Sequence, residues 1–134
     1  MSAGVPFTVG CDVVDVARMR RLVAERPAAR ERIFTERELA DALRGGVDPD
    51  GDVVVERLAA RFAGKEATRK ALGARGPSLT AIEVRTSEDG SPSVWIDGAP
   101  TGLACSLSHD AGVAMAVVIG EAPTDAPADA PDGR

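Results

Sequence analysis

VVVERLAARFAGKEATRKALG, residues 53–73, is the stretch that decides the fold, because it predicts one long helix around which the rest of the chain can pack. Apolar residues recur along it at i, i+4 spacing: Val54, Leu58 and Phe62. Gly73 stands just beyond the expected last residue, where glycine commonly ends a helix. The sequence therefore predicts a helix over about residues 53–72.

The middle of this helix, residues 61–71, is rich in charge. Glu66 lies one turn beyond Phe62 and follows the buried stripe instead of facing water. Glu66 with Lys70, and Lys65 with Arg69, are i, i+4 neighbours. A solvated helix with intrahelical ion pairs is the ordinary interpretation. The small residues in the same run also permit close approach of a ligand or a partner chain.

The flanking segments predict short helices before the long one and strands after it. Residues 5–14 form an apolar strand, and Asp15 caps a helix over 16–26 that Pro27 closes. Thr35 and Glu38 have the spacing of a capping box. Strand-like runs follow at 79–85, 93–96, 103–107 and 113–119. This order predicts an α+β fold, with helices packed on one face of a mostly antiparallel sheet.

Length and composition exclude several classes of protein. A chain of 134 residues suits one domain, expected over residues 1–121, followed by a disordered Pro/Ala/Asp-rich tail over 122–134. A net charge of −5 and 3% aromatic residues argue against nucleic-acid binding. No apolar run approaches the roughly 20 residues that cross a bilayer. Cys11 and Cys105 are expected to be buried free thiols in a cytoplasmic protein.

Two further polar groups interrupt apolar segments. Asp12 lies inside the first strand, where an unpaired carboxylate would cost several kcal/mol unless a cation or donors satisfy it. Its ordinary interpretation is a residue that turns the strand into the next helix. His109, the only histidine, ends the run Ser106-Leu107-Ser108-His109. A lone histidine is more often structural than catalytic.

Taken together, these motifs resemble the holo-[acyl-carrier-protein] synthases, the short bacterial type of 4′-phosphopantetheinyl transferase. The resemblance rests on four runs in order: 10–15 (GCDVVD), 32–38 (RIFTERE), 61–71 (RFAGKEATRKA) and 106–109 (SLSH). It implies the 4′-phosphopantetheinyl transferase fold. It also implies transfer of the phosphopantetheine arm of coenzyme A to a serine of apo acyl carrier protein, with release of adenosine 3′,5′-bisphosphate.

The resemblance also implies roles for individual residues. Asp12 and Glu66 match the ligands of a Mg²⁺ ion, a hard cation that prefers carboxylate and phosphate oxygens. Lys70 matches the lysine that meets the leaving phosphate, and Glu66 or a water on the metal is the candidate base. The remaining matches concern coenzyme A: Arg61 and Lys65 near its phosphates, and His109 near its nucleotide.

The implied partner is an acidic carrier protein. Arg18 falls on the position of a family residue that contacts the carrier, and Arg21 lies one turn further on. Family members form homotrimers with each site between two subunits. Two alternatives stay open: a carrier-binding module of the same fold without turnover, and a structural α+β subunit. A carrier-binding module without turnover would be expected to have lost Asp12, Glu66 or Lys70, and all three are present. A structural subunit would not explain why the carboxylates of Asp12 and Glu66 lie in apolar segments.

Overall fold

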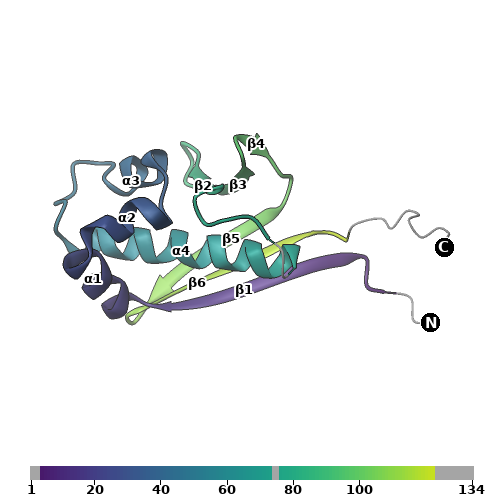
Figure 1. Ribbon diagram of the computed structural model, residues 1–134, viewed down its shortest axis with the longest axis horizontal. Helices are drawn as coiled ribbons and strands as arrows, with labels where there is room; N and C mark the ends of the chain where they lie inside the picture. Colours follow the sequence, from purple (N-terminus) through teal and green to yellow (C-terminus); the bar gives the residue numbers. More distant parts are fainter. Residues whose placement is uncertain (1–3, 74–75, 123–134) are drawn as a thin grey trace.

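The computed structural model describes residues 4–73 and 76–122 (Figure 1). Five strands and four helices carry most of this part of the chain, in the order β1 (Phe7–Asp15), α1 (Val16–Glu25), α2 (Pro27–Ile33), α3 (Glu36–Ala42), α4 (Asp52–Leu72), β2 (Ile82–Thr86), β3 (Pro92–Ile96), β5 (Ala104–Asp110) and β6 (Val113–Glu121). A two-residue strand, β4 (Ala99–Pro100), lies between β3 and β5. Most of the predicted tail lies outside the described residues.

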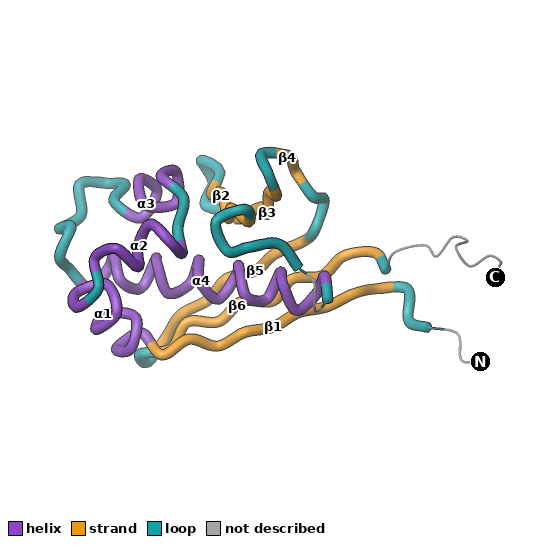
Figure 2. Tube along the Cα trace, viewed as in Figure 1, coloured by secondary structure: helices purple, strands orange, loops and turns teal. Residues whose placement is uncertain are grey.

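Two antiparallel three-stranded sheets are present. The longer strands pair in the order β1-β6-β5 and the shorter in the order β2-β3-β4. Helix α4 lies along one face of the β1-β6-β5 sheet (Figure 2). Helices α1–α3 gather near the N-terminal half of α4, and the small β2-β3-β4 sheet lies next to α3. The α+β prediction is confirmed, with a second sheet in addition to the main one. None of the described helices is long and apolar enough to cross a membrane.

The helix α4 predicted from the sequence is confirmed to within one residue. Its environment is not that of a solvated charged helix, because buried residues lie on most of its sides. Apolar side chains of α1, β1, β6 and α4 form one core cluster, which includes Val14, Met19, Leu58, Ala67 and Ala116.

Gly10 allows strand β1 to lie close against α4. A Cβ atom at this position would stand 1.9 Å from the carbonyl oxygen of Ala67 and 2.8 Å from the amide nitrogen of Ala71. Thr8, two residues earlier on the same face of the strand, donates a hydrogen bond to the carbonyl of Ala71. Any larger residue at position 10 would therefore push the strand and helix apart.

The helices before α4 follow the sequence signals with one omission. The capping box is confirmed, because Thr35 Oγ1 accepts from the amide of Glu38 while the Glu38 carboxylate accepts from the amide of Thr35. Pro27 ends α1 as predicted, but it also opens α2, which the sequence interpretation missed. Proline suits the first position of a helix because the missing amide would have no partner there.

The other face of the main sheet is apolar and exposed. Side chains at alternate positions of β1 and β6 point away from α4, since successive residues of a strand face opposite sides. The large exposed members are Phe7, Val9, Val13, Val113, Met115 and Ile119. Cys11 lies among them and is exposed, so the predicted burial of this thiol is wrong. Cys105 faces α4 and is partly buried, and this burial raises its pKa to about 11.

Candidate active site

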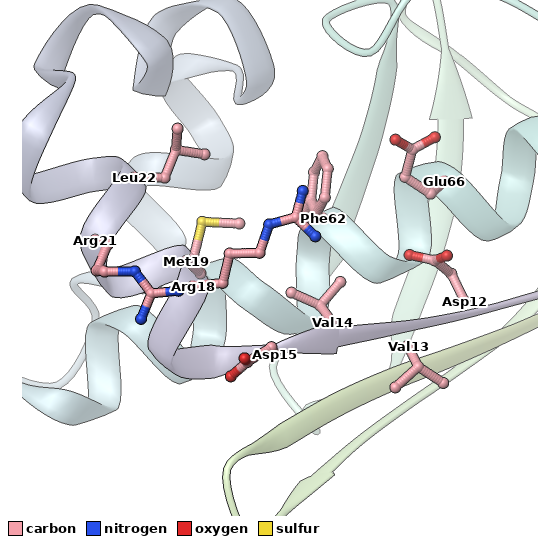
Figure 3. Close-up of a pocket in the computed structure, with 10 residues that line it drawn as sticks. All are labelled: Asp12, Val13, Val14, Asp15, Arg18, Met19, Arg21, Leu22, Phe62 and Glu66. Carbon is pink, nitrogen blue, oxygen red and sulfur yellow. The ribbon is translucent and has the colours of Figure 1, made fainter.

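A cleft of about 450 Å³ lies where β1, α1 and α4 meet (Figure 3). Its lining residues come from all three elements: Asp12, Val13, Val14, Asp15, Arg18, Met19, Arg21, Leu22, Phe62 and Glu66. Four of the residues singled out by the sequence, Asp12, Arg18, Arg21 and Glu66, thus share one cavity. The cleft has an acidic end, an apolar floor and a basic side.

The acidic end is formed by Asp12 and Glu66. In Figure 3 the Asp12 carboxylate points toward the turn of α4 that carries Glu66, and the Glu66 carboxylate points away from Asp12. Asp12 lies two residues after Gly10 on the same face of β1, so the close contact at Gly10 fixes its position against α4. Glu66 follows Phe62 by one turn, and both side chains line the cleft. The Asp12 side chain is 18% exposed and the Glu66 side chain 32%.

Lys70 lies beside this acidic end. Its Nζ atom donates to Oδ1 of Asp12 at 3.1 Å and to the carbonyl oxygen of Cys11 at 3.0 Å. The intrahelical pair predicted between Lys70 and Glu66 is therefore replaced by a contact with the strand. Glu66 instead lies 3.9 Å from Arg69, one helical turn away. This tertiary contact joins Lys70 to Asp12 of the 10–15 run, 58 residues away in sequence.

The basic side of the cleft comes from α1. Arg18 and Arg21 are both exposed, and the Arg18 side chain extends toward the Phe62 ring in Figure 3. Asp15 accepts a hydrogen bond from the amide of Ala17 and so caps this helix directly after the strand. The short connection from Asp12 to Arg18 brings an acidic pair and two cations to the same opening.

Lys65 lies on a different side of α4 and is fully buried. Its ammonium pairs with Glu38 of α3 and donates to the carbonyl of Ile82 at 2.7 Å. No part of this side chain reaches solvent in the single chain, and the coenzyme A contact of Lys65 stays a prediction.

Glu38 is the partner that the sequence interpretation missed. Its second carboxylate oxygen accepts from the amide of Val84 at 2.7 Å, which ties α3 to β2. Burial raises the pKa of Glu38, an effect that the Lys65 charge opposes, and burial lowers the pKa of Lys65. The capping box identified Glu38 as the third residue of a helix, but its long-range partner depends on the tertiary fold.

Arg61 and His109 do not line the cleft within the described chain. Arg61 is buried and donates to the hydroxyl of Thr86 at 2.7 Å, and burial lowers its pKa. Its Nε atom is buried and has no hydrogen-bond partner. His109 is exposed on β5, two strands away from β1 in the main sheet.

The acidic end of the cleft fits a hard divalent cation. Among residues 4–73 and 76–122, no group of three or more His, Cys, Asp or Glu side chains is placed to hold a metal ion. Two carboxylates suffice for Mg²⁺, which keeps several waters and takes further oxygens from substrate phosphates. The donor chemistry at Asp12 and Glu66 therefore suits Mg²⁺ better than zinc or another soft metal.

Comparison with known proteins matches this architecture. The model of the 4′-phosphopantetheinyl transferase superfamily matches residues 8–118. This chain belongs to that superfamily. The match runs from the strand that carries Asp12 to the last strand of the main sheet.

Relatives of this chain can be aligned with it over most of their length. The holo-[acyl-carrier-protein] synthase of Streptomyces avermitilis is 40% identical over 124 residues, which cover 84% of this chain and 95% of the relative. That of Streptomyces coelicolor is 44% identical over 123 residues, with 84% and 95% covered. A holo-(acyl-carrier-protein) synthase structure from Bacillus anthracis, in complex with CoA (3′,5′-ADP), has a TM-score of 0.70 at 31% identity and covers 87% of this chain and 96% of that one.

Proposed function

We propose that this protein is a Mg²⁺-dependent holo-[acyl-carrier-protein] synthase. It transfers the 4′-phosphopantetheine arm of coenzyme A to a serine hydroxyl of apo acyl carrier protein and releases adenosine 3′,5′-bisphosphate. The observation that carries the proposal is that Asp12 and Glu66 line one cleft and that Lys70, beside it, pairs with Asp12 at 3.1 Å. These residues come from motifs far apart in the sequence, and relatives about 40% identical carry the corresponding name.

The residues in and beside the cleft would have different roles in phosphoryl transfer. Asp12 and Glu66 would hold the Mg²⁺ ion, which when bound neutralises charge on the pyrophosphate oxygens as the bond breaks. Glu66 is also the candidate acceptor for the proton of the attacking serine. Lys70 supplies a positive charge, and the option of a proton, to the departing phosphate. The nucleophile belongs to the carrier protein, so no serine of this chain is needed.

The basic side of the cleft would receive the carrier. Arg18 and Arg21 place two positive charges beside the acidic end, on a protein whose net charge is −5. Acidic carrier proteins would be steered toward this local patch by complementary charge. The two arginines are therefore expected to affect docking rather than the chemical step.

A homotrimer would bring His109 of one subunit to the site of another. The apolar outer face of β1 and β6 supports assembly, because exposed patches of this kind on soluble proteins usually mark an interface. A site shared between two subunits would also explain why the exposed His109 lies apart from Asp12 in one chain. Light scattering tests the assembly, and Val9→Asp, which puts a charge in the apolar face, should release monomers.

The free thiols and the implied substrates fit a cytoplasmic protein. Localisation to that compartment is part of the proposal, and fractionation of cells that express the protein would test it.

The central experiment is direct. The protein is incubated with coenzyme A, Mg²⁺ and several apo carrier proteins, and the phosphopantetheine increment on serine is sought by intact mass. We expect Asp12→Ala and Glu66→Ala to abolish the increment while their circular dichroism remains that of the wild type. EDTA should stop the reaction until Mg²⁺ is returned. Absence of the increment on every carrier tested would overturn the proposal.

A further inference from the structure

The ammonium of Lys70 already occupies one oxygen of the Asp12 carboxylate. The contact is 3.1 Å to Oδ1, with a second hydrogen bond of 3.0 Å to the backbone carbonyl of Cys11. The Lys70 side chain is 57% exposed and that of Asp12 is 18% exposed. Lys70 is therefore a solvent-reaching partner of a largely covered carboxylate.

The same carboxylate is assigned to the divalent cation. A Mg²⁺ ion at Asp12 and an ammonium on the same carboxylate repel each other, because like charges within a few ångströms are unfavourable even in water. Lys70 has space to leave. A second hollow, of about 430 Å³, is lined by Glu66, Arg69, Lys70 and Gly73 and adjoins the cleft through Glu66. Its two cations suit an anionic phosphate.

We propose that Lys70 and the divalent cation exchange at Asp12. Lys70 holds the carboxylate toward α4 in the metal-free protein, and cation binding releases its ammonium into the hollow beside Arg69. There it meets the phosphate of the coenzyme. The exchange rests on the proposed function for its role in catalysis, although the competition at Asp12 is a property of this chain alone.

The exchange predicts two effects of opposite sign when Lys70 loses its charge. Affinity for a divalent cation rises, because the competing ammonium is gone. Turnover falls, because the released ammonium no longer reaches the phosphate. A Lys70 that merely orders the site would lower both quantities, and a Lys70 that acts only on substrate would leave cation affinity unchanged.

The test is a Mn²⁺ titration of the full chain without coenzyme A, with free Mn²⁺ measured by electron paramagnetic resonance. Lys70→Met keeps the length of the side chain and removes its charge. We expect it to bind Mn²⁺ about two- to fivefold more tightly than the wild type, the range that a partly exposed ion pair allows. Arg32→Gln removes an equal charge from an exposed position on α2 and should leave the affinity unchanged.

Each outcome decides between explanations. Equal or weaker Mn²⁺ binding by Lys70→Met overturns the exchange, as does an equal gain in Arg32→Gln, which would show a general charge effect. Absence of Mn²⁺ binding by the wild type at concentrations that support transfer also overturns it. Transfer to apo carrier protein is measured in parallel on the wild type. If transfer occurs without the affinity gain, only the exchange fails, whereas absence of transfer on every carrier is the failure of the proposed function.

Discussion

The two lysines of this chain lie on the same helix, five residues apart, but in opposite environments: Lys65 is buried and Lys70 is exposed. Lys65 is sealed in the interior between α3 and β2, with its charge matched by Glu38. Lys70 lies beside the cleft, where its ammonium contacts Asp12 and is open to solvent. Burial closes Lys65 off from solvent, whereas the ammonium of Lys70 remains accessible to a ligand. The difference shows that charge in a helical motif acquires meaning only from the elements that pack against it.

The largest expected effect comes from breaking the buried pair. Lys65→Ala leaves the Glu38 carboxylate without its cation, and such a loss costs about 3–5 kcal/mol of unfolding free energy. Urea unfolding followed by circular dichroism measures it. The double variant Glu38→Leu with Lys65→Met should recover most of the loss, because apolar residues of similar size often replace a buried ion pair without cost. A double variant as unstable as the single one would contradict the structural role.

The exposed lysine should show the reverse pattern. Lys70→Ala is expected to change the free energy of unfolding by about 1 kcal/mol or less, since ion pairs of this exposure contribute little. The turnover number should fall by about 100-fold or more, with a smaller effect on the Michaelis constant for coenzyme A. Lys70→Arg separates two roles, because arginine keeps the charge but does not release a proton near neutral pH. An unimpaired Lys70→Ala enzyme would leave only a surface ion pair.

Gly10→Ala tests what holds the Asp12 side of α4 in place. The added methyl group would overlap the carbonyl of Ala67, so strand and helix must separate. We expect a loss of about 1–3 kcal/mol of unfolding free energy, together with weaker Mg²⁺ activation as Asp12 and Glu66 lose their relative positions. Gly4→Ala is the matched control, because nothing lies within 4 Å of its Cβ position. Normal stability in Gly10→Ala would show that the close approach is not required.

The smallest effect is expected on the basic side of the cleft. Charge reversal at Arg18 or Arg21 should raise the Michaelis constant for apo carrier protein about fivefold or more while changing that for coenzyme A little. The effect should shrink as salt rises, because exposed charges are screened. Steady-state kinetics at two ionic strengths measure both constants. Parallel changes in the two would mean that α1 is not the carrier surface.

Local signals in the sequence specified the elements well. The apolar spacing of α4 and the capping box at Thr35 each follow from interactions between residues close in sequence. The second role of Pro27, as the first residue of α2, was missed because proline both ends one helix and suits the start of the next.

Other features depended on contacts between distant residues. Cys11 stands in an apolar strand, yet it is exposed, because the helices cover only the opposite face of the main sheet. The pairing of Lys65 with Glu38 joins residues 27 apart, and that of Lys70 with Asp12 joins residues 58 apart. Helical spacing favoured Glu66 as the partner of Lys70.

The sequence by itself determined which segments become strand and most of those that become helix, and its family motifs pointed to four residues that share one cleft: Asp12, Arg18, Arg21 and Glu66. Only the tertiary structure decided which charges are buried, which face of the sheet is left open and which partner each lysine takes. The physical reason is the range of the interactions. Helix caps and apolar periodicity are set within a few residues, whereas the burial of a charge is set by elements that meet only when the chain has folded.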